Sequence, residues 1–300
     1  MQSGYVTTEG DDLYFEVRGQ GQPLLMVPGG GGDGNSYSAI AQRLSEGFKV
    51  IMYARRAGGR STMNHPDHFD IAQQSRDAIA VLQAVGETSA FVLGNSSGAV
   101  IALDIATTYP EAVVAIVAHE PPLARMHPDS VKWQSFFQNV HSLWRRFGPG
   151  IAMLKFSFGI GFDFSFIAAY RAIRAARKIR ARSAHAYLNR RKVIDFFLGQ
   201  ELLPVTNYTP SLNALQRMKD KIMMAAGQKS LANERFCAQV APLLAEQIGC
   251  ETVLFPGHHG SFVDMPDEWA SCLGETLKRR VGCCASSDRG VSKGWKQGRE

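Results

Sequence analysis

The sequence has little cysteine and no long hydrophobic run, and both shortages limit what the protein can be. Its five cysteines contain no C-x-x-C pair, and they are Cys237, Cys250, Cys272, Cys283 and Cys284. A zinc site and a disulfide framework are therefore not indicated, and we expect a cytoplasmic protein. No run of about 18 apolar residues is present, as a membrane-spanning helix requires. The N-terminal residues also lack the apolar core of a signal peptide.

Acidic residues are missing from one long segment of the chain. Residues 167–192 contain nine Lys or Arg and no Asp or Glu, and the last dozen residues are basic again. The net charge of +6 therefore comes from these two segments and not from the chain as a whole. We interpret the basic segment as a solvated helix face, with a surface for a membrane or an anionic ligand as the alternative. We expect a small-molecule substrate, no nucleic acid and no membrane association; the oligomeric state stays open.

Short β-rich runs alternate with helical periods, which predicts an α/β fold with a mostly parallel sheet of about eight strands flanked by helices. Strands are predicted at Gly4–Thr8, Leu13–Val17, Leu24–Val27, Val50–Tyr53, Phe91–Leu93, Val113–Ala118, Ile222–Ala226 and Thr252–Phe255. Apolar residues at i, i+3 and i+4 predict helices at Tyr37–Leu44, Ile71–Val85, Ala99–Tyr109, Glu234–Ile248 and Asp267–Arg280.

The alternation stops after the sixth predicted strand and resumes at the seventh. Between them the sequence has only aromatic-rich and Arg-rich helical stretches, such as Trp133–Phe147 and Ala168–Arg182. We interpret this block as a helical insertion that caps one edge of the sheet. Its aromatic side chains either line an apolar pocket or pack against one another. The polar residues 281–300 have no period, and we expect them to be disordered.

The strongest chemical signal is the G-x-S-x-G sequence formed by Gly94, Ser96 and Gly98. It follows an apolar strand and begins an apolar helix, which is the context of a nucleophile elbow. The elbow needs a strained backbone at the serine and very small residues two positions before and after it. We therefore predict Ser96 as a nucleophile. The alternative is a glycine-rich turn whose serine caps the helix.

A second signal is the glycine-rich segment Gly29–Gly34, interrupted only by Asp33, which follows the strand Leu24–Val27 and Pro28. Residues without side chains allow backbone N–H groups to approach a developing oxyanion closely. A phosphate-binding loop is the competing interpretation, but no Lys-Ser/Thr pair follows the glycines.

The third signal is the pair His258 and His259, which comes straight after the last predicted strand. In a parallel sheet this position lies at the same edge as Ser96. Catalytic serines and their histidine bases occur in several chain orders, and one of them has the serine early and the histidine late, as here. A surface loop and a fortuitous metal site are the alternatives for an isolated His-His pair.

These segments together resemble the α/β-hydrolase fold. The resemblance assigns residues 1–123 and 217–280 to the core and residues 124–216 to a helical cap or lid. It implies that the backbone N–H groups of Gly30 and Ser97 form an oxyanion hole, and that His259 rather than His258 is the base. Residues Tyr53–Ser61 are similar to the family's D-x-R-G-x-G-x-S segment, although Ala54 replaces the usual Asp.

The acid of the triad is where the chain departs from the family pattern. An Asp commonly follows the penultimate strand, but here Gln228 stands there, and a neutral amide stabilises an imidazolium poorly. Some relatives place the acid after the strand that follows the nucleophile helix, and Glu120 occupies that position. We therefore predict a triad of Ser96, His259 and Glu120.

The expected activity is that of a serine hydrolase that cleaves an ester, thioester or lactone of a small to medium apolar molecule. Such a mechanism passes through an acyl-enzyme and needs no metal and no organic cofactor. Two alternatives stay open. One is cofactor-free C–C hydrolase, lyase or perhydrolase chemistry on the same scaffold. The other is a ligand-binding protein with a vestigial triad.

Overall fold

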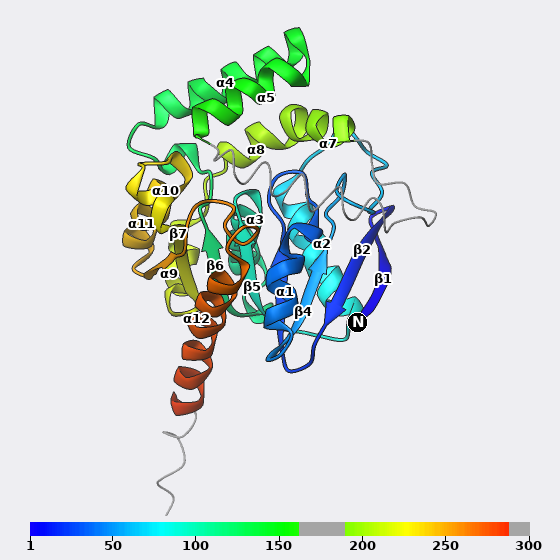
Figure 1. Cartoon of the computed structure of the whole chain (residues 1–300), viewed down its shortest axis with the longest axis vertical. Helices are drawn as coiled ribbons and strands as arrows, with labels where there is room; N and C mark the ends of the chain where they lie inside the picture. The colour runs from blue at the N-terminus through cyan, green and yellow to red at the C-terminus, as the bar shows by residue number, and fades with distance from the viewer. Residues whose placement is uncertain (162–189, 288–300) are drawn as a thin grey trace, which may run out of the picture.

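A computed structural model describes residues 1–161 and 190–287 of the chain (Figure 1). Its centre is an eight-stranded sheet in the order β1-β2-β4-β3-β5-β6-β7-β8. β1 pairs antiparallel with β2, β2 pairs antiparallel with β4, and the remaining neighbours are parallel. The strands are β1 (Gln2–Thr8), β2 (Asp11–Arg18), β3 (Gln22–Val27), β4 (Phe48–Tyr53), β5 (Ala90–Asn95), β6 (Val113–His119), β7 (Ile222–Gly227) and β8 (Glu251–Phe255). The predicted fold class is confirmed.

Helices cover both faces of the sheet (Figure 1). Along β3, Leu25 and Val27 belong to one buried cluster, and Leu24 and Met26 belong to the other, because successive side chains of a strand point to opposite faces. The first cluster contains side chains of α2 (Ile71–Ala84), α3 (Ser97–Thr108) and α11 (Phe236–Ile248). The second contains side chains of α1 (Ser38–Leu44) and α12 (Pro266–Ser287).

Among the described residues between β6 and β7, helices are joined by short loops and no strand occurs. The helices are α4 (Ser130–Phe147), α5 (Pro149–Ile160), α7 (Arg190–Phe196), α8 (Leu202–Thr206) and α9 (Leu212–Arg217). A π-helical turn, η4 (Phe197–Glu201), joins α7 to α8. Figure 1 shows α4, α5, α7 and α8 together at the top, across one end of the sheet. The predicted helix Ala168–Arg182, with most of the basic segment, lies outside the described residues.

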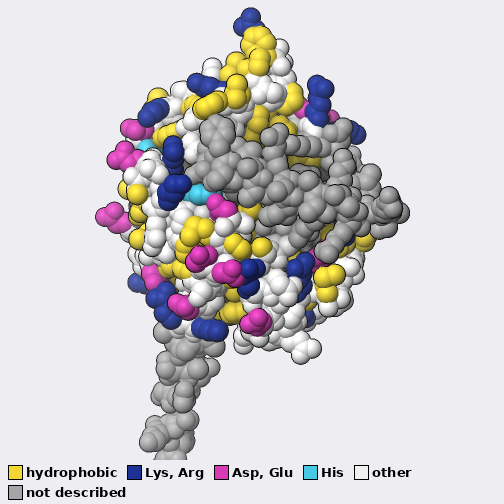
Figure 2. Space-filling view, in the orientation of Figure 1, with side chains coloured by type: hydrophobic (Ala, Val, Ile, Leu, Met, Phe, Trp, Pro, Cys, Tyr) yellow, Lys and Arg dark blue, Asp and Glu magenta, His cyan; other side chains and the backbone are white. Residues whose placement is uncertain are grey.

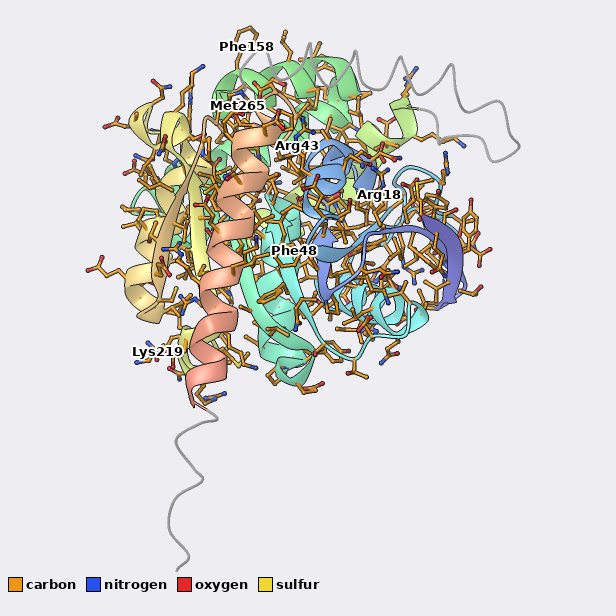
Figure 3. The ribbon with its side chains drawn as sticks, turned by 60° about the horizontal axis from the view of Figure 1, so that its bottom comes forward. Arg18, Arg43, Phe48, Phe158, Lys219 and Met265 are labelled. Atoms are coloured by element: carbon orange, nitrogen blue, oxygen red, sulfur yellow. The ribbon has the colours of Figure 1, made fainter. Side chains whose placement is uncertain are left out.

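Several aromatic side chains of this segment pack against one another and against α11. The ring centroids of Trp133 and Phe236 are 4.3 Å apart, and those of Phe136 and Phe137 are 5.2 Å apart. Phe158 is 65% exposed and lies at the outer edge of the molecule (Figure 3). In the orientation of Figure 1, apolar side chains also lie at the top of the molecule, over α4 and α5 (Figure 2).

The C-terminal helix is longer than predicted. We expected a helix to Arg280 and disorder from residue 281, but α12 continues to Ser287. Residues 281–287 are therefore helical, and residues 288–300 lie outside the described part of the chain. None of the helices in the described ranges combines the length and the apolar character needed to cross a bilayer.

Candidate active site

Ser96 lies on the turn between β5 and α3, with the backbone strain expected of an elbow. Its φ of 56° and ψ of −124° are rare for a residue with a side chain, and its hydroxyl forms no capping hydrogen bond to α3. The two glycines are required by space. A Cβ on Gly94 would lie 2.2 Å from the carbonyl oxygen of Gly98, and one on Gly98 would lie 2.1 Å from that of Val27. Ser96 thus lies at the strained point of the turn, and its side chain does not cap the helix.

The glycine loop after β3 lies directly against this turn. A Cβ built on Gly29 would be 2.9 Å from the Asn95 carbonyl oxygen and 3.2 Å from the Ser96 Cβ, so a side chain here would force the two segments apart. Ser97 is the first residue of α3, where backbone N–H groups have no intrahelical partner and the helix dipole favours negative charge. The turn and the glycine loop therefore bring backbone donors to the same end of β3 and β5.

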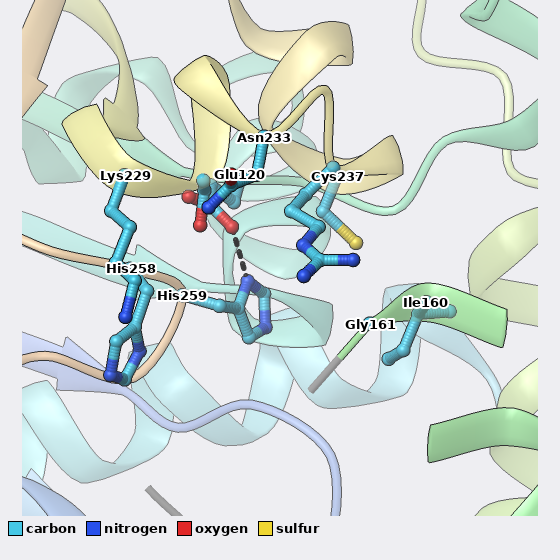
Figure 4. A pocket seen from close by; sticks show the side chains of 10 residues that line it. Glu120, Ile160, Gly161, Lys229, Asn233, Cys237, His258 and His259 are labelled. Atoms are coloured by element: carbon cyan, nitrogen blue, oxygen red, sulfur yellow. Dashed lines mark hydrogen bonds and ion pairs between the residues drawn. The ribbon is translucent and has the colours of Figure 1, made fainter. Parts of the chain in front are cut away.

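Glu120 and His259 meet at the same edge of the sheet, although 139 residues separate them in the chain. His259 Nδ1 lies 2.6 Å from Glu120 Oε2, the contact drawn as a dashed line in Figure 4. Because a carboxylate only accepts hydrogen bonds, Nδ1 carries the proton and Nε2 carries the lone pair of the neutral ring. An imidazole in this tautomer is able to take a proton at Nε2.

The fully buried carboxylate of Glu120 is held ionised. Burial alone would raise its pKa, but the hydrogen bond with His259, the electrostatic interactions with His259 and His119 and the Gly227 N–H outweigh burial and lower the pKa to about 2. The Gly227 N–H donates to Glu120 Oε1 at 2.9 Å. Glu120 also has a positive φ of 50°, and its N–H donates to the Ala225 carbonyl at 2.9 Å. Hydrogen bonds from β7 therefore hold both the strained backbone and the carboxylate of Glu120, which follows the end of β6.

His258 has different partners from its neighbour. Its Nε2 lies 2.9 Å from Asp264 Oδ2, and its Nδ1 accepts from the Gly260 N–H at 3.2 Å. Both ring nitrogens are thus engaged within the loop that follows β8. Gln228 is exposed at the start of α10 (Gln228–Ala232), while the Nδ1 of His259 is bonded to Glu120.

Sequence reasoning missed two residues that connect these loops. The side chain of Asn95 donates to the His259 carbonyl at 3.1 Å and lies 2.8 Å from Nδ1 of His119, a fully buried residue. The Ser96 N–H donates to the His119 carbonyl at 2.9 Å. Asn95 precedes the serine and His119 precedes Glu120, so adjacency to the predicted triad was the available signal.

A small pocket of about 50 Å³ lies beside the His259–Glu120 pair (Figure 4). Its lining includes Glu120 and His259 but not Ser96. The lining residues are Glu120, Ile160, Gly161, Lys229, Ser230, Asn233, Arg235, Cys237, His258 and His259.

A family model described as the alpha/beta hydrolase fold matches residues 22–232. The chain belongs to the alpha/beta hydrolase family. It is 28% identical over 287 residues to the uncharacterized hydrolase YraK of Bacillus subtilis (strain 168), an alignment that covers 93% of this chain and 97% of the relative. The resemblance seen in the sequence is thereby confirmed, and the chain is a hydrolase of this fold.

Solved structures share the same architecture at low sequence identity. A thermophilic esterase from Thermogutta terrifontis, solved with malate bound, superposes with a TM-score of 0.70 at 20% identity, covering 93% of this chain and 99% of that one. The enol-lactonase from Burkholderia xenovorans LB400 gives a TM-score of 0.68 at 14% identity, covering 93% and 100%.

Proposed function

We propose that this alpha/beta-fold hydrolase is a serine hydrolase that cleaves an ester, thioester or lactone of a small to medium apolar molecule. The observation that carries the proposal is the 2.6 Å contact between His259 Nδ1 and the buried Glu120, at the sheet edge where Ser96 is held at positive φ. The esterase and the lactonase that share the fold support carbonyl chemistry of this kind.

In the proposed mechanism His259 Nε2 takes the proton of Ser96 as its hydroxyl attacks the substrate carbonyl. The N–H groups of Gly30 and Ser97 stabilise the tetrahedral oxyanion, and each such donor is typically worth about 3 kcal/mol. His259 then protonates the leaving group and activates the water that hydrolyses the acyl-enzyme. Glu120 fixes the tautomer of His259 and stabilises its protonated form. The segment between β6 and β7 acts as the lid, and the protein works in the cytoplasm without a metal or an organic cofactor.

Steady-state hydrolysis of p-nitrophenyl esters and of simple lactones tests the proposal. Ser96→Ala and His259→Ala should each lower kcat by about 10⁴-fold or more, since both take part in proton transfer and bond formation. Glu120→Gln should lower kcat by roughly 10²- to 10⁴-fold, because a neutral amide does not stabilise the imidazolium.

His258→Ala is the matched control, because it removes the adjacent imidazole without touching the Glu120 contact. It should keep kcat within about tenfold of the wild-type value, a loss far below that expected of a general base. Equal losses in the two histidine variants would contradict the choice of His259. Cleavage of vinylogous diketones without ester turnover would favour C–C chemistry, and specific ligand binding without turnover would favour a binding protein.

A further inference from the structure

Arg55 is a buried cation that the proposed mechanism does not use. It follows β4, and its side chain is only 1% exposed. The guanidinium donates from Nε to the Pro28 carbonyl at 2.9 Å and from Nη2 to the Gly29 carbonyl at 2.7 Å. Nη1 donates to the side chain of Gln74 at 3.1 Å. Arg55 therefore holds two consecutive carbonyl groups of the glycine loop.

Fixing these carbonyls also fixes the N–H groups of the same peptide units. A peptide unit is planar and trans, so its C=O and N–H point in opposite directions. The Gly29 carbonyl shares its peptide unit with the Gly30 N–H. With that carbonyl bonded to Arg55, the Gly30 N–H points away from the guanidinium. Glycine has little intrinsic backbone preference, so contacts must select this orientation, and the Gly29 carbonyl accepts from the Gly32 N–H at 2.9 Å as well as from Arg55.

The anchor of Arg55 comes from the segment between β6 and β7. Glu201 Oε1 lies 2.6 Å from Arg55 Nη2, and the side chains of both residues are 1% exposed. Glu201 ends the π-helical turn η4, and Phe197 begins it. A Cβ built on Gly30 would lie 2.8 Å from the Phe197 ring, so this one turn contacts both the loop and its anchor. Single π-turns of this kind are frequently found at functional sites.

We propose that Arg55, held by Glu201, is a positioning residue that orients the Gly30 N–H as an oxyanion donor. The geometry of the oxyanion hole then depends on the segment between β6 and β7, because Glu201 belongs to that segment. The inference rests on the proposed serine hydrolase mechanism. Lysine cannot take over the role, since one ammonium cannot reproduce a planar fork that reaches two carbonyls and a carboxylate together.

The test compares Arg55→Lys and Glu201→Gln with the wild type in p-nitrophenyl ester hydrolysis. Arg55→Lys should lower kcat by about 10- to 100-fold while KM changes by less than about threefold, because oxyanion contacts form mainly in the transition state. Glu201→Gln should cause a smaller loss, since Arg55 keeps its bonds to the loop carbonyls. Inhibition by an alkylboronic acid, which forms a tetrahedral adduct, should weaken by the same factor as kcat.

Arg56→Lys is the matched control, because it changes another buried arginine one position along the chain. Arg56 is bonded to Asp77 at 2.6 Å and to Asp11 at 2.5 Å, and neither partner belongs to the glycine loop. At a temperature where circular dichroism shows every variant folded, Arg56→Lys should leave kcat and boronate inhibition within about twofold of the wild type, as expected of a residue that makes no transition-state contact.

Two results would overturn the positioning role. One is a folded Arg55→Lys protein with wild-type kcat and boronate affinity. The other is an equal loss of kcat in Arg55→Lys and Arg56→Lys, which would indicate general destabilisation. A folded wild-type protein that neither hydrolyses esters nor binds the boronate would instead contradict the proposed function itself.

Discussion

Two non-glycine residues of the site, Ser96 and Glu120, have φ values of 56° and 50°. A backbone conformation of this kind costs of order 1–3 kcal/mol and persists only where the surroundings over-determine it. Here the Ser96 N–H is bonded to the His119 carbonyl, and the Glu120 N–H is bonded to the Ala225 carbonyl. Hydrogen bonds from neighbouring strands thus hold the strained positions that present the hydroxyl and the carboxylate.

His119 links the two strained residues and should make stability depend on pH. Its full burial lowers its pKa from 6.5 to about 4, against the opposing effect of Glu120. Below pH 6.5 His119 binds a proton in the unfolded chain, whereas in the native state it does not bind one until about pH 4. The free energy of unfolding should therefore fall as the pH is lowered from 6.5 to 4.

Urea titrations between pH 7 and pH 4 measure this dependence. His119→Gln retains a side-chain acceptor for Asn95 but does not titrate, so its stability should vary less with pH than that of the wild type. Identical slopes for the two proteins would show that His119 is not the group responsible.

The first turn of α3 fits against the end of β3 only because Gly98 has no side chain. Gly98→Ala should lower the free energy of unfolding by about 1–3 kcal/mol, the usual range for overpacking. It should also lower kcat/KM, because the displaced turn carries Ser96. Thermal or urea denaturation and ester hydrolysis measure both effects.

Gly150→Ala is the control for that substitution. Gly150 occupies the same second position in α5, but nothing lies within 4 Å of its added Cβ. The change should stabilise the protein slightly, by roughly 0.5–1 kcal/mol, through the better helix propensity of alanine. A Gly98→Ala protein as stable and active as Gly150→Ala would contradict the close fit.

Most helices and strands were predictable from the sequence, because buried elements have a recognisable local pattern of apolar residues. Apolar runs such as Leu24–Val27 indicate strands that are covered on both faces. The roles of Arg55 and Glu201 were not predictable in this way, because their contact joins residues 146 positions apart in the chain. The extension of α12 to Ser287 was missed because the residues beyond Arg280 show no amphipathic period.

At the scale of the whole molecule, the antiparallel hairpin of β1 and β2 is fastened to the rest of the fold by a buried ionic cluster. Arg56, after β4, bonds Asp11 of β2 and Asp77 of α2, and all three side chains are at most 6% exposed. Arg56→Met should lower the free energy of unfolding by about 3–5 kcal/mol, because two carboxylates then lose their buried partner.

Chemical denaturation measures this loss. The control is an exposed ion pair between Arg43 of α1, labelled in Figure 3, and Asp267 of α12. Arg43→Met should shift the unfolding midpoint far less, since solvent screens that pair. Equal shifts in the two variants would show that burial of the Arg56 cluster does not strengthen the attachment of the hairpin.

Labelling of the folded protein with a fluorophosphonate, followed by peptide mass analysis, tests directly whether Ser96 is a nucleophile. We expect one phosphonylated residue, Ser96, and complete loss of the label in Ser96→Ala. A label on any other residue, or a folded wild-type protein that takes up none, would contradict this expectation.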